Sequence, residues 1–405
     1  MTLASPRLDP KQATQVLAQI DEREVVEFLQ SLVRIPSINP PGDVRDAIAR
    51  CRETLEAAGF AIEILAEEET KPNLIARLER GSGPVLLWNA HVDVVPTGEE
   101  SAWTHPPFGA EIHDRRVYGR GAGDDKASVT AQIMAALALA RSGVPLRGTL
   151  IVNTVADEEI GGVAGSQLVA QSDTIRPDFV IVGEQTLNRV CVGEKGGQGV
   201  RVTVYGRAAH GALPWEGANA IEGMARVIVA LQDELWPELA KRTHPYFHPS
   251  SACVSLIEGG VKSNVVPDRC TIHIDRRIVP GEKPAEVVAE IRRVAEQAIA
   301  RIPGLRVEVE PAGWGGREAT VVAEDSPIVK AMLAANQYLG FDTTLTGFSM
   351  ATDGRHFAAR GYPTIIYGPG DPSLAHKPDE WVGIDEVLDA TRAYALAGLA
   401  ILGGA

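Results

Sequence analysis

The stretch VLLWNAHVDVVP, residues 85–96, joins an apolar run typical of a buried strand to a polar segment that contains His91 and Asp93. Three more strand-like runs, TLIVNTV, DFVIV and TIIY, also lead into polar stretches. The other polar stretches are GRGAGDDK (119–126), ADEEIGG (156–162), VGEQT (182–186) and AHKPDEW (375–381). In open α/β sheets, functional groups gather just beyond the carboxyl ends of the strands. The pattern therefore predicts one polar site built from segments that are distant in the chain.

Around this stretch, strand-like runs alternate with helical patterns. Strands are expected at 60–66, 73–79, 84–90, 149–155 and 178–183, and helices near 11–34, 43–58, 126–141 and 161–171. Near the C-terminus we expect a helix at 326–339, a strand at 363–367 and a final helix at 384–401. Such alternation is typical of an α/β fold with a mostly parallel sheet that is covered on both faces.

From about Lys195 the pattern changes. It reads as strand 199–206, helix 217–235, strands 252–258 and 268–277, helix 284–301 and strand 305–310. This β-α-β-β-α-β order is that of a ferredoxin-like sandwich. The segment PAGWGGREA (311–319) is expected to be a return linker. Glu184 precedes this unit and His376 follows it, so the first domain must be discontinuous if both residues belong to one site. We expect a catalytic domain at 1–194 and 312–405, with an inserted domain at 195–311.

The composition indicates a globular protein with more than one core. The chain has 405 residues, which favours two domains. Its formal charge of −14 argues against nucleic acid or an anionic membrane surface as a partner. The four cysteines form no CxxC pair, so a thiolate zinc site and a disulfide framework are not expected. No secretory leader and no long apolar span is visible, and we expect a cytoplasmic protein.

The polar stretches together supply the ligands of a two-metal hydrolytic centre. Imidazole and carboxylate suit zinc, and also cobalt or manganese. One carboxylate can bridge two ions about 3.5–4 Å apart, leaving positions for water and substrate. The candidate ligands are His91, Asp124, Glu159, Glu184 and His376. Asp93 is placed to orient the imidazole of His91 through a hydrogen bond.

The adjacent glutamates Glu158 and Glu159 suggest a division of labour. Neighbouring residues leaving a strand point in different directions, so one can face the metals while the other transfers protons as general base and acid. Each motif alone has an ordinary interpretation: a surface loop, solvated glutamates, or a helix cap at Asp124 or Asp125. The argument lies in their conjunction at successive strand ends. In a different turn register Asp125 rather than Asp124 would bridge.

HVDVVP, GRGAGDDK, ADEEIGG and HKPDEW, in this order and after LVRIPSINPPG (32–42), resemble the di-zinc metallopeptidase and deacylase family. That family includes acetylornithine deacetylase, succinyl-diaminopimelate desuccinylase, aminoacylase and glutamate carboxypeptidase, and the match covers nearly the whole chain. The resemblance implies a zinc-peptidase-like catalytic domain with an inserted lid and dimerisation domain. The implied roles are Asp124 as bridge, His91 and Glu184 on one ion, Glu159 and His376 on the other, Glu158 as acid/base, and Asp93 as partner of a ligand. The sequence departs from many relatives at Asp125, where they carry another residue.

The resemblance also gives roles to residues of the inserted domain. The position of His210 reaches the active site of a partner subunit and stabilises the oxyanion, which implies a homodimer. Asn264 and Arg277 match substrate-binding positions, and a guanidinium is well shaped to grip a carboxylate. Gly368 and Gly370 are expected in a tight substrate loop. Without the resemblance, these residues would read as ordinary surface and turn positions.

The sequence thus predicts a metallohydrolase that uses metal-activated water to remove the acyl group from N-acyl amino acids. The segment GPGDPSLAHKPDEW (368–381) most resembles the acetylornithine deacetylase type. An exopeptidase that acts on dipeptides or a carboxy-terminal residue is the close alternative, since both substrates present an amide and a carboxylate. A non-catalytic protein that binds metal or an amino-acid derivative is the remote alternative.

Overall fold

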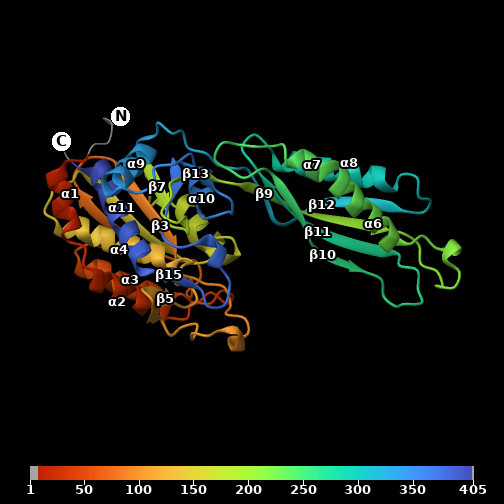
Figure 1. The fold of residues 1–405 in the computed structure, drawn as a ribbon, viewed down its shortest axis with the longest axis horizontal. Coiled ribbons are helices and arrows are strands. Elements are labelled where there is room, and N and C mark those ends of the chain that lie inside the picture. The colour runs from red at the N-terminus through yellow and green to blue at the C-terminus, as the bar shows by residue number, and fades with distance from the viewer. Residues whose placement is uncertain (1–7, 404–405) are drawn as a thin grey trace. The chain divides into compact units, whose positions relative to one another are not determined.

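The computed structural model of the chain describes residues 8–403 and divides into two compact units (Figure 1). Unit 1 contains the chain up to Gly193, Val322–Phe348 and the chain from Thr352 onward. Unit 2 contains Glu194–Val321 and the short piece Ser349–Ala351. Within residues 8–403, no helix has the length and apolar character needed to cross a membrane. The cytoplasmic location stays a prediction.

Unit 1 is built on a mixed eight-stranded sheet with a parallel centre. The strand order is β1-β2-β6-β3-β7-β14-β8-β13. The strands are β1 (Ala61–Leu65), β2 (Asn73–Arg80), β3 (Val85–His91), β6 (Gly148–Val155), β7 (Phe179–Val182), β8 (Cys191–Glu194), β13 (Thr346–Phe348) and β14 (Thr364–Ile366). The pairs β6–β3, β3–β7 and β7–β14 are parallel, whereas β1–β2, β2–β6 and β14–β8 are antiparallel. The expected parallel sheet is therefore confirmed at its centre, which is the part that supports the polar site.

Helices cover both faces of this sheet. They are α1 (Pro10–Leu17), α2 (Glu22–Val33), α3 (Arg45–Ala57), α4 (Lys126–Arg141), α5 (Leu168–Gln171), α9 (Pro327–Leu339), α10 (Gly354–Ala358) and α11 (Ile384–Leu402). Figure 1 shows α4 and α11 side by side, and both contact β3 and β6. Because side chains alternate along a strand, Trp88 of β3 packs against Tyr394 of α11, while Leu87 joins the cluster near α5 and α10 on the other face. The helix α4 is buried along almost its whole length, which explains its alanine-rich, uncharged interior.

A small three-stranded sheet connects distant parts of unit 1. Its strand order is β15-β5-β4, formed by β4 (Glu111–His113), β5 (Arg116–Tyr118) and β15 (Trp381–Gly383). Trp381 pairs with Tyr118, so the segment that contains His376 lies beside the turn that precedes α4. The pairing brings the polar stretches AHKPDEW (375–381) and GRGAGDDK (119–126) together.

Unit 2 is an antiparallel sheet covered by helices. Its elements are β9 (Gly196–Tyr205), α6 (Ala220–Ala230), α7 (Trp236–Leu239), β10 (Ser251–Gly259), β11 (Arg269–Ile278), α8 (Pro284–Ile299) and β12 (Arg306–Arg317). The sheet order β10-β11-β9-β12 is that of a β-α-β-β-α-β sandwich. Inward-facing residues of β9 (Val200, Val202 and Val204) pack against Met224 of α6 and Ile291 of α8.

One element of unit 2 differs from expectation. The segment 311–319, expected as a return linker, belongs mostly to β12, which runs to Arg317. Ala312 pairs with Gly199 and Arg317 with Gly197, with a register shift between them. The glycines of this segment read as a loop, but β9 is equally glycine-rich opposite them, so the two backbones can approach closely. A Cβ on Gly199 would lie 2.2 Å from the carbonyl oxygen of Ala312.

Candidate metal centre

The predicted ligands of unit 1 converge at the carboxyl edge of its parallel strands. His91 is the last residue of β3, Glu158 and Glu159 follow β6, and Glu184 lies two residues beyond β7. Because β6, β3 and β7 are parallel neighbours, their ends meet at one edge. Asp124 lies in the turn before α4, and the peptide bond after it is cis.

Asp124 lies between the two histidines. Its Oδ1 is 3.3 Å from Nε2 of His91, and its Oδ2 is 3.3 Å from Nε2 of His376. His376 is also 3.2 Å from Oε2 of Glu159. The ligand atoms form two groups, and within each group all atoms lie within 4.8 Å of one another. One group comes from His91, Asp124 and Glu184, and the other from Asp124, Glu159 and His376. The two groups share only Asp124.

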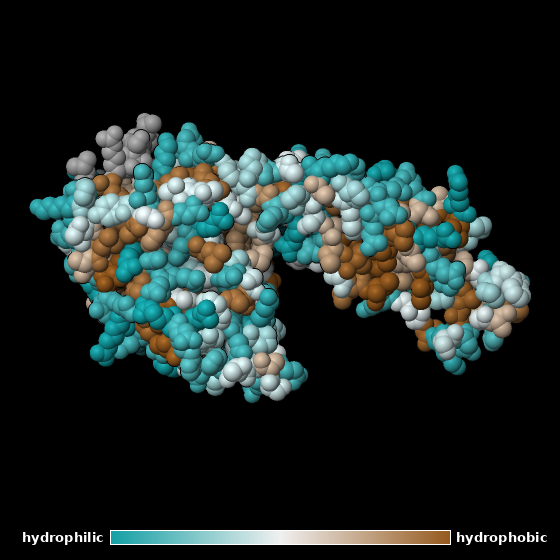
Figure 2. Space-filling view, viewed as in Figure 1, coloured by the Kyte–Doolittle hydropathy of each residue, from teal (hydrophilic) through white to brown (hydrophobic). Residues whose placement is uncertain are grey.

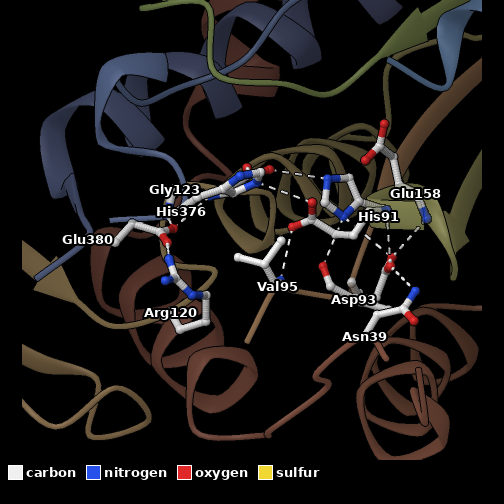
Figure 3. A network of polar contacts seen from close by, with 12 residues as sticks. Asn39, His91, Asp93, Val95, Arg120, Gly123, Glu158, His376 and Glu380 are labelled. Atoms are coloured by element: carbon white, nitrogen blue, oxygen red, sulfur yellow. Dashed lines mark hydrogen bonds and ion pairs between the residues drawn. The ribbon is translucent and has the colours of Figure 1, made fainter. Parts of the chain in front are cut away.

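Asp93 holds the backbone around this cluster (Figure 3). Its carboxylate accepts the backbone N–H of Glu158 at 3.2 Å and that of Glu159 at 3.3 Å. Asn39 donates its side-chain amide to the same carboxylate at 2.8 Å. Nδ1 of His91 lies 3.0 Å from the Asp93 carbonyl oxygen and 3.5 Å from Oδ1. Asp93 therefore orients the imidazole and anchors the turn that carries both glutamates.

Glu380 and Arg120 support the other side of the cluster (Figure 3). Oε1 of Glu380 accepts the backbone N–H groups of Gly123 and Asp124, both at 3.0 Å. Its Oε2 pairs with the guanidinium of Arg120, and both side chains are buried. Burial raises the pKa of Glu380 to about 7, and the nearby Asp124 carboxylate adds to this shift. The pair fixes the glycine-rich turn that presents Asp124.

Glu158 lies beside the cluster without joining either ligand group. Figure 3 shows its backbone connected to Asp93 while its carboxylate lies close to His91. Burial raises the pKa of this carboxyl well above its usual value. The guanidinium of Arg355 lies 4.0 Å from Oε1 of Glu158. A carboxyl with a raised pKa beside a polar centre is placed to accept and return a proton.

The electrostatics of the cluster suit divalent cations. Burial raises the pKa of Glu184 well above its usual value, and the charges of Asp124 and Asp125 raise it further. Burial alone would lower the pKa of His91, but its contacts with Asp124 and Asp93 outweigh burial and raise it. Nε2 of His91 is buried with no hydrogen-bond partner. Cations among these donors would relieve the repulsion and use the imidazole nitrogen, so the residues fit two metal ions.

Asp125 lies next to the cluster but in different surroundings. Neither of its buried oxygen atoms has a hydrogen-bond partner, and burial raises the pKa of its carboxyl to about 8. Asp124, by contrast, faces both histidines. The geometry thus favours Asp124 over Asp125 as the residue shared by two ions.

Gly368 and Gly370 pack against the turn after β7. The backbone N–H of Gly368 donates to Oγ1 of Thr186, whose hydroxyl donates back to the Gly368 carbonyl, both at 3.1 Å. A Cβ on Gly368 would lie 2.5 Å from the carbonyl oxygen of Glu184, and Gly370 has φ +95°. Both positions therefore require glycine.

The predicted residues of unit 2 lie at opposite ends of its sheet. The loop of Asn264 pairs with that of His210, since the backbone N–H of Gly211 donates to the Asn264 carbonyl at 2.8 Å. Both lie beyond the end of the sheet at which Arg269 pairs with Tyr205. Arg277 pairs with Gly197 at the other end, eight residues along β11. That separation is roughly 26 Å, at about 3.3 Å per residue.

Several structural supports were not assigned from the sequence. Asn39, Arg120 and Glu380 lie in quoted motifs, but nothing in their spacing showed that they hold Asp93 or the Asp124 turn. Lys71 and Asp157, which pair at 2.8 Å beneath the glutamate turn, lie 86 residues apart. Only the strand pairing brings such partners together.

Comparison with known proteins agrees with this architecture. Residues 87–399 match the profile of peptidase family M20/M25/M40. A succinyl-diaminopimelate desuccinylase from Marinobacter nauticus is 30% identical over 382 residues, covering 91% of this chain and 96% of that protein. A tripeptidase structure from Staphylococcus aureus matches with a TM-score of 0.78 at 20% identity, covering 95% of this chain and 99% of that one. A Bacillus subtilis structure, described as a dinuclear metal-binding peptidase, matches with a TM-score of 0.69 at 20% identity, covering 93% and 97%.

Proposed function

Because the chain belongs to peptidase family M20/M25/M40, a family of hydrolases that act on amide bonds, we propose that it removes the acyl group from N-acyl amino acids. The observation that carries the proposal is the pair of ligand groups sharing Asp124 with Glu158 beside them. Glu158 lies beside the ligand groups but belongs to neither, which supports catalysis over metal binding alone. The desuccinylase relatives, about 30% identical over most of the chain, support the deacylase activity.

Two divalent ions, zinc with cobalt or manganese as substitutes, would be held by the five predicted ligands. His91 and Glu184 would hold one ion, Glu159 and His376 the other, and Asp124 both. When bound, such ions lower the pKa of water to about 7 and polarise the scissile carbonyl. The mixed imidazole and carboxylate donors support these metals.

Glu158 would move the proton. Its carboxylate accepts a proton from the attacking water and then donates it to the leaving nitrogen of the amide. The pKa raised by burial supports this role, because a carboxylate of higher pKa is the stronger base toward water. Asp93 fixes the backbone N–H groups of Glu158 and Glu159 and thereby holds the proton-transfer group beside the ligands.

Arg277 would bind the α-carboxylate of the amino-acid part of the substrate. Its guanidinium now contacts both oxygens of Asp275 at 2.9 Å, in the bidentate geometry that a carboxylate requires. A substrate carboxylate would bind in competition with Asp275 or alongside it. Asn264 and the loop of Gly368 and Gly370 are the further substrate contacts in this proposal.

A homodimer would let His210 contribute to the active site of the partner subunit. Arg277 and His210 lie more than roughly 26 Å apart in unit 2, far more than one N-acyl amino acid spans. If both contact substrate, they serve different sites, one in each chain. The open edge of β10 supports contact with a second copy, since Leu256 and Ile257 are both 59% exposed. Figure 2 shows apolar residues gathered on the visible face of unit 2, and Val229 of α6 is 53% exposed.

The close alternative is a di-metal exopeptidase. The structural likeness to a tripeptidase favours it, although at 20% identity that likeness concerns the fold. A panel of N-acetyl, N-succinyl and aromatic N-acyl amino acids, assayed beside dipeptides with added zinc, cobalt or manganese, separates the two. Faster turnover of any N-acyl amino acid than of every dipeptide supports the deacylase. The reverse order supports the peptidase. If protein with its full metal content turns over none of these substrates, both proposed activities are contradicted.

A further inference from the structure

A second set of metal-type donors lies in unit 1, on the small three-stranded sheet. Glu111 and His113 are two residues apart in β4 and so point to the same side of the strand. His105 reaches them from the preceding loop. Oε2 of Glu111 lies 2.8 Å from Nδ1 of His105 and 3.3 Å from Nε2 of His113. The three ligand atoms all lie within 4.8 Å of one another. We call these three residues the surface histidine cluster.

The cluster is held in place by its surroundings. Oδ1 of Asp379 accepts the backbone N–H of Thr104 at 2.7 Å and that of His105 at 3.1 Å. The ring of His105 packs at a tilt against those of His113 and Tyr118, with centroids 4.5 Å and 4.2 Å away. Tyr118 in turn pairs with Glu111 across the β4–β5 ladder. The donors therefore already face one another and need little ordering to bind an ion.

The donor chemistry selects the kind of ion. Two imidazoles and one carboxylate suit zinc, copper or nickel, whereas calcium and magnesium prefer oxygen ligands. Ligand atoms around a tetrahedral zinc ion are roughly 3.3 Å apart, close to the separations of the cluster. Hydrogen bonds from His105 and then His113 lower the pKa of Glu111, so this ligand is ionised at neutral pH. The side chains of Glu111 and His113 are 43% and 53% exposed, which leaves room for water to complete the coordination.

We propose that His105, Glu111 and His113 bind one divalent late transition-metal ion, at a site additional to the candidate metal centre. None of the three residues belongs to the two ligand groups around Asp124. The site is nevertheless connected to them, because Asp379 lies three residues after His376 and holds the loop of His105. An ion in the surface histidine cluster would stabilise that contact between the two loops.

The test is metal stoichiometry with Zn²⁺ as the probe. Native chain, His113→Ala and Glu111→Gln are dialysed to equilibrium against micromolar zinc, and bound zinc per chain is measured by elemental mass spectrometry. His248→Ala removes an exposed histidine elsewhere and is the matched control. Native and control chains should bind one ion more than either cluster variant. Equal zinc content in all four, with circular dichroism showing that each is folded, overturns the proposal.

Copper gives an independent readout. Cu²⁺ binds imidazole sites more tightly than zinc and should displace it from the cluster, giving an electron paramagnetic resonance signal with coupling to two imidazole nitrogens, reduced to one in His113→Ala. A spectrum unchanged by that substitution contradicts the site. Because each comparison is between native and cluster variants, failure of the proposed hydrolase activity would leave both results unaffected.

Discussion

The carboxylate of Glu380 accepts the backbone N–H of Asp124 at 3.0 Å, so a residue near the C-terminus holds the turn that presents the shared ligand. The same carboxylate accepts the N–H of Gly123 and pairs with Arg120. The position of Asp124 between two histidines thus depends on a buried ion pair as well as on the turn itself.

Weakening that support should weaken metal binding. Glu380→Gln keeps the size of the side chain but removes the charge that pairs with Arg120, and we expect metal affinity to fall about 10- to 100-fold. Competition with a chelator of known affinity measures the change. Glu27→Gln, which removes one partner of the exposed Arg23–Glu27 pair, is the control and should leave affinity unchanged. Equal affinity in Glu380→Gln and native chain would contradict this role.

Glu158→Gln should lose turnover while keeping its metals. The amide cannot accept the proton of the attacking water, and general acid–base catalysis contributes about 100- to 10,000-fold. We expect kcat to fall by that factor with unchanged metal content, measured on the best substrate of the panel. Near-native turnover would remove Glu158 as the proton carrier.

The metal-free protein should be less stable at pH 8 than at pH 6. Burial raises the pKa of Glu158, Glu184 and Glu380, so these carboxyls hold protons in the folded chain that the unfolded chain releases above about pH 4.5. Their contribution to stability therefore falls as the pH rises. Contacts with Asp124 and Glu159 raise the pKa of His376 to about 10, and its stabilising charge is also lost with rising pH, through that value.

Urea unfolding after chelation, at both pH values, measures this effect. At one fixed concentration of free zinc, restored metal should raise the free energy of unfolding by about 2.7 kcal/mol for each site whose dissociation constant is a hundredfold lower than that concentration. The gain should be larger at pH 8, because the ligands then release fewer protons when they bind metal. A metal-free chain that is more stable at pH 8 would contradict the electrostatic account of the site.

His210→Ala tests the shared active site. We expect a lower kcat with an unchanged melting temperature, because His210 is exposed and its ring makes one local hydrogen bond, from the N–H of Ala212. Mixing His210→Ala with Glu158→Gln chains under conditions of subunit exchange should restore part of the activity. The mixed dimer has one site with an intact Glu158 and an intact partner His210. No recovery in a mixture shown to exchange subunits would exclude sharing.

Arg277→Met should mainly raise KM for substrates with a free α-carboxylate. Loss of the bidentate contact removes about 1.5–3 kcal/mol of binding, the range for hydrogen bonds to charged groups. The methyl ester of the same substrate is the control and should show little change between native and variant chains. Equal loss on acid and ester would argue against carboxylate binding by Arg277.

Local patterns in the sequence predicted much of the fold. The alternating Val200, Val202 and Val204 and the helical patterns around them were enough to indicate the order of unit 2, since periodicity depends only on near neighbours. The parallel centre of the main sheet followed from strands alternating with helices. The antiparallel pairing of β1, β2 and β6 and the extension of β12 to Arg317 were not predicted, because they depend on which strand lies alongside.

Four of the five candidate ligands were identifiable because each lies at or beyond the end of a strand of the parallel centre, and these strand ends meet at one edge; Asp124 lies instead in the turn before α4. The residues that support these ligands could not be identified, because no local pattern in the sequence marks them. Glu380 and Arg120, or Lys71 and Asp157, are ordinary charged residues until the fold buries them side by side. The surface histidine cluster was missed in the same way, since its three residues carry no motif and only the loop geometry brings His105 to β4.

The late position of His376 also has a consequence for biosynthesis. Four of the five candidate ligands have been translated by Glu184, yet the fifth follows only after nearly two hundred further residues. A ribosome must therefore complete unit 2 and most of the remaining chain before the second cation can be captured. A chain that ended before His376 would carry four of the five candidate ligands and lack one member of the second ligand group.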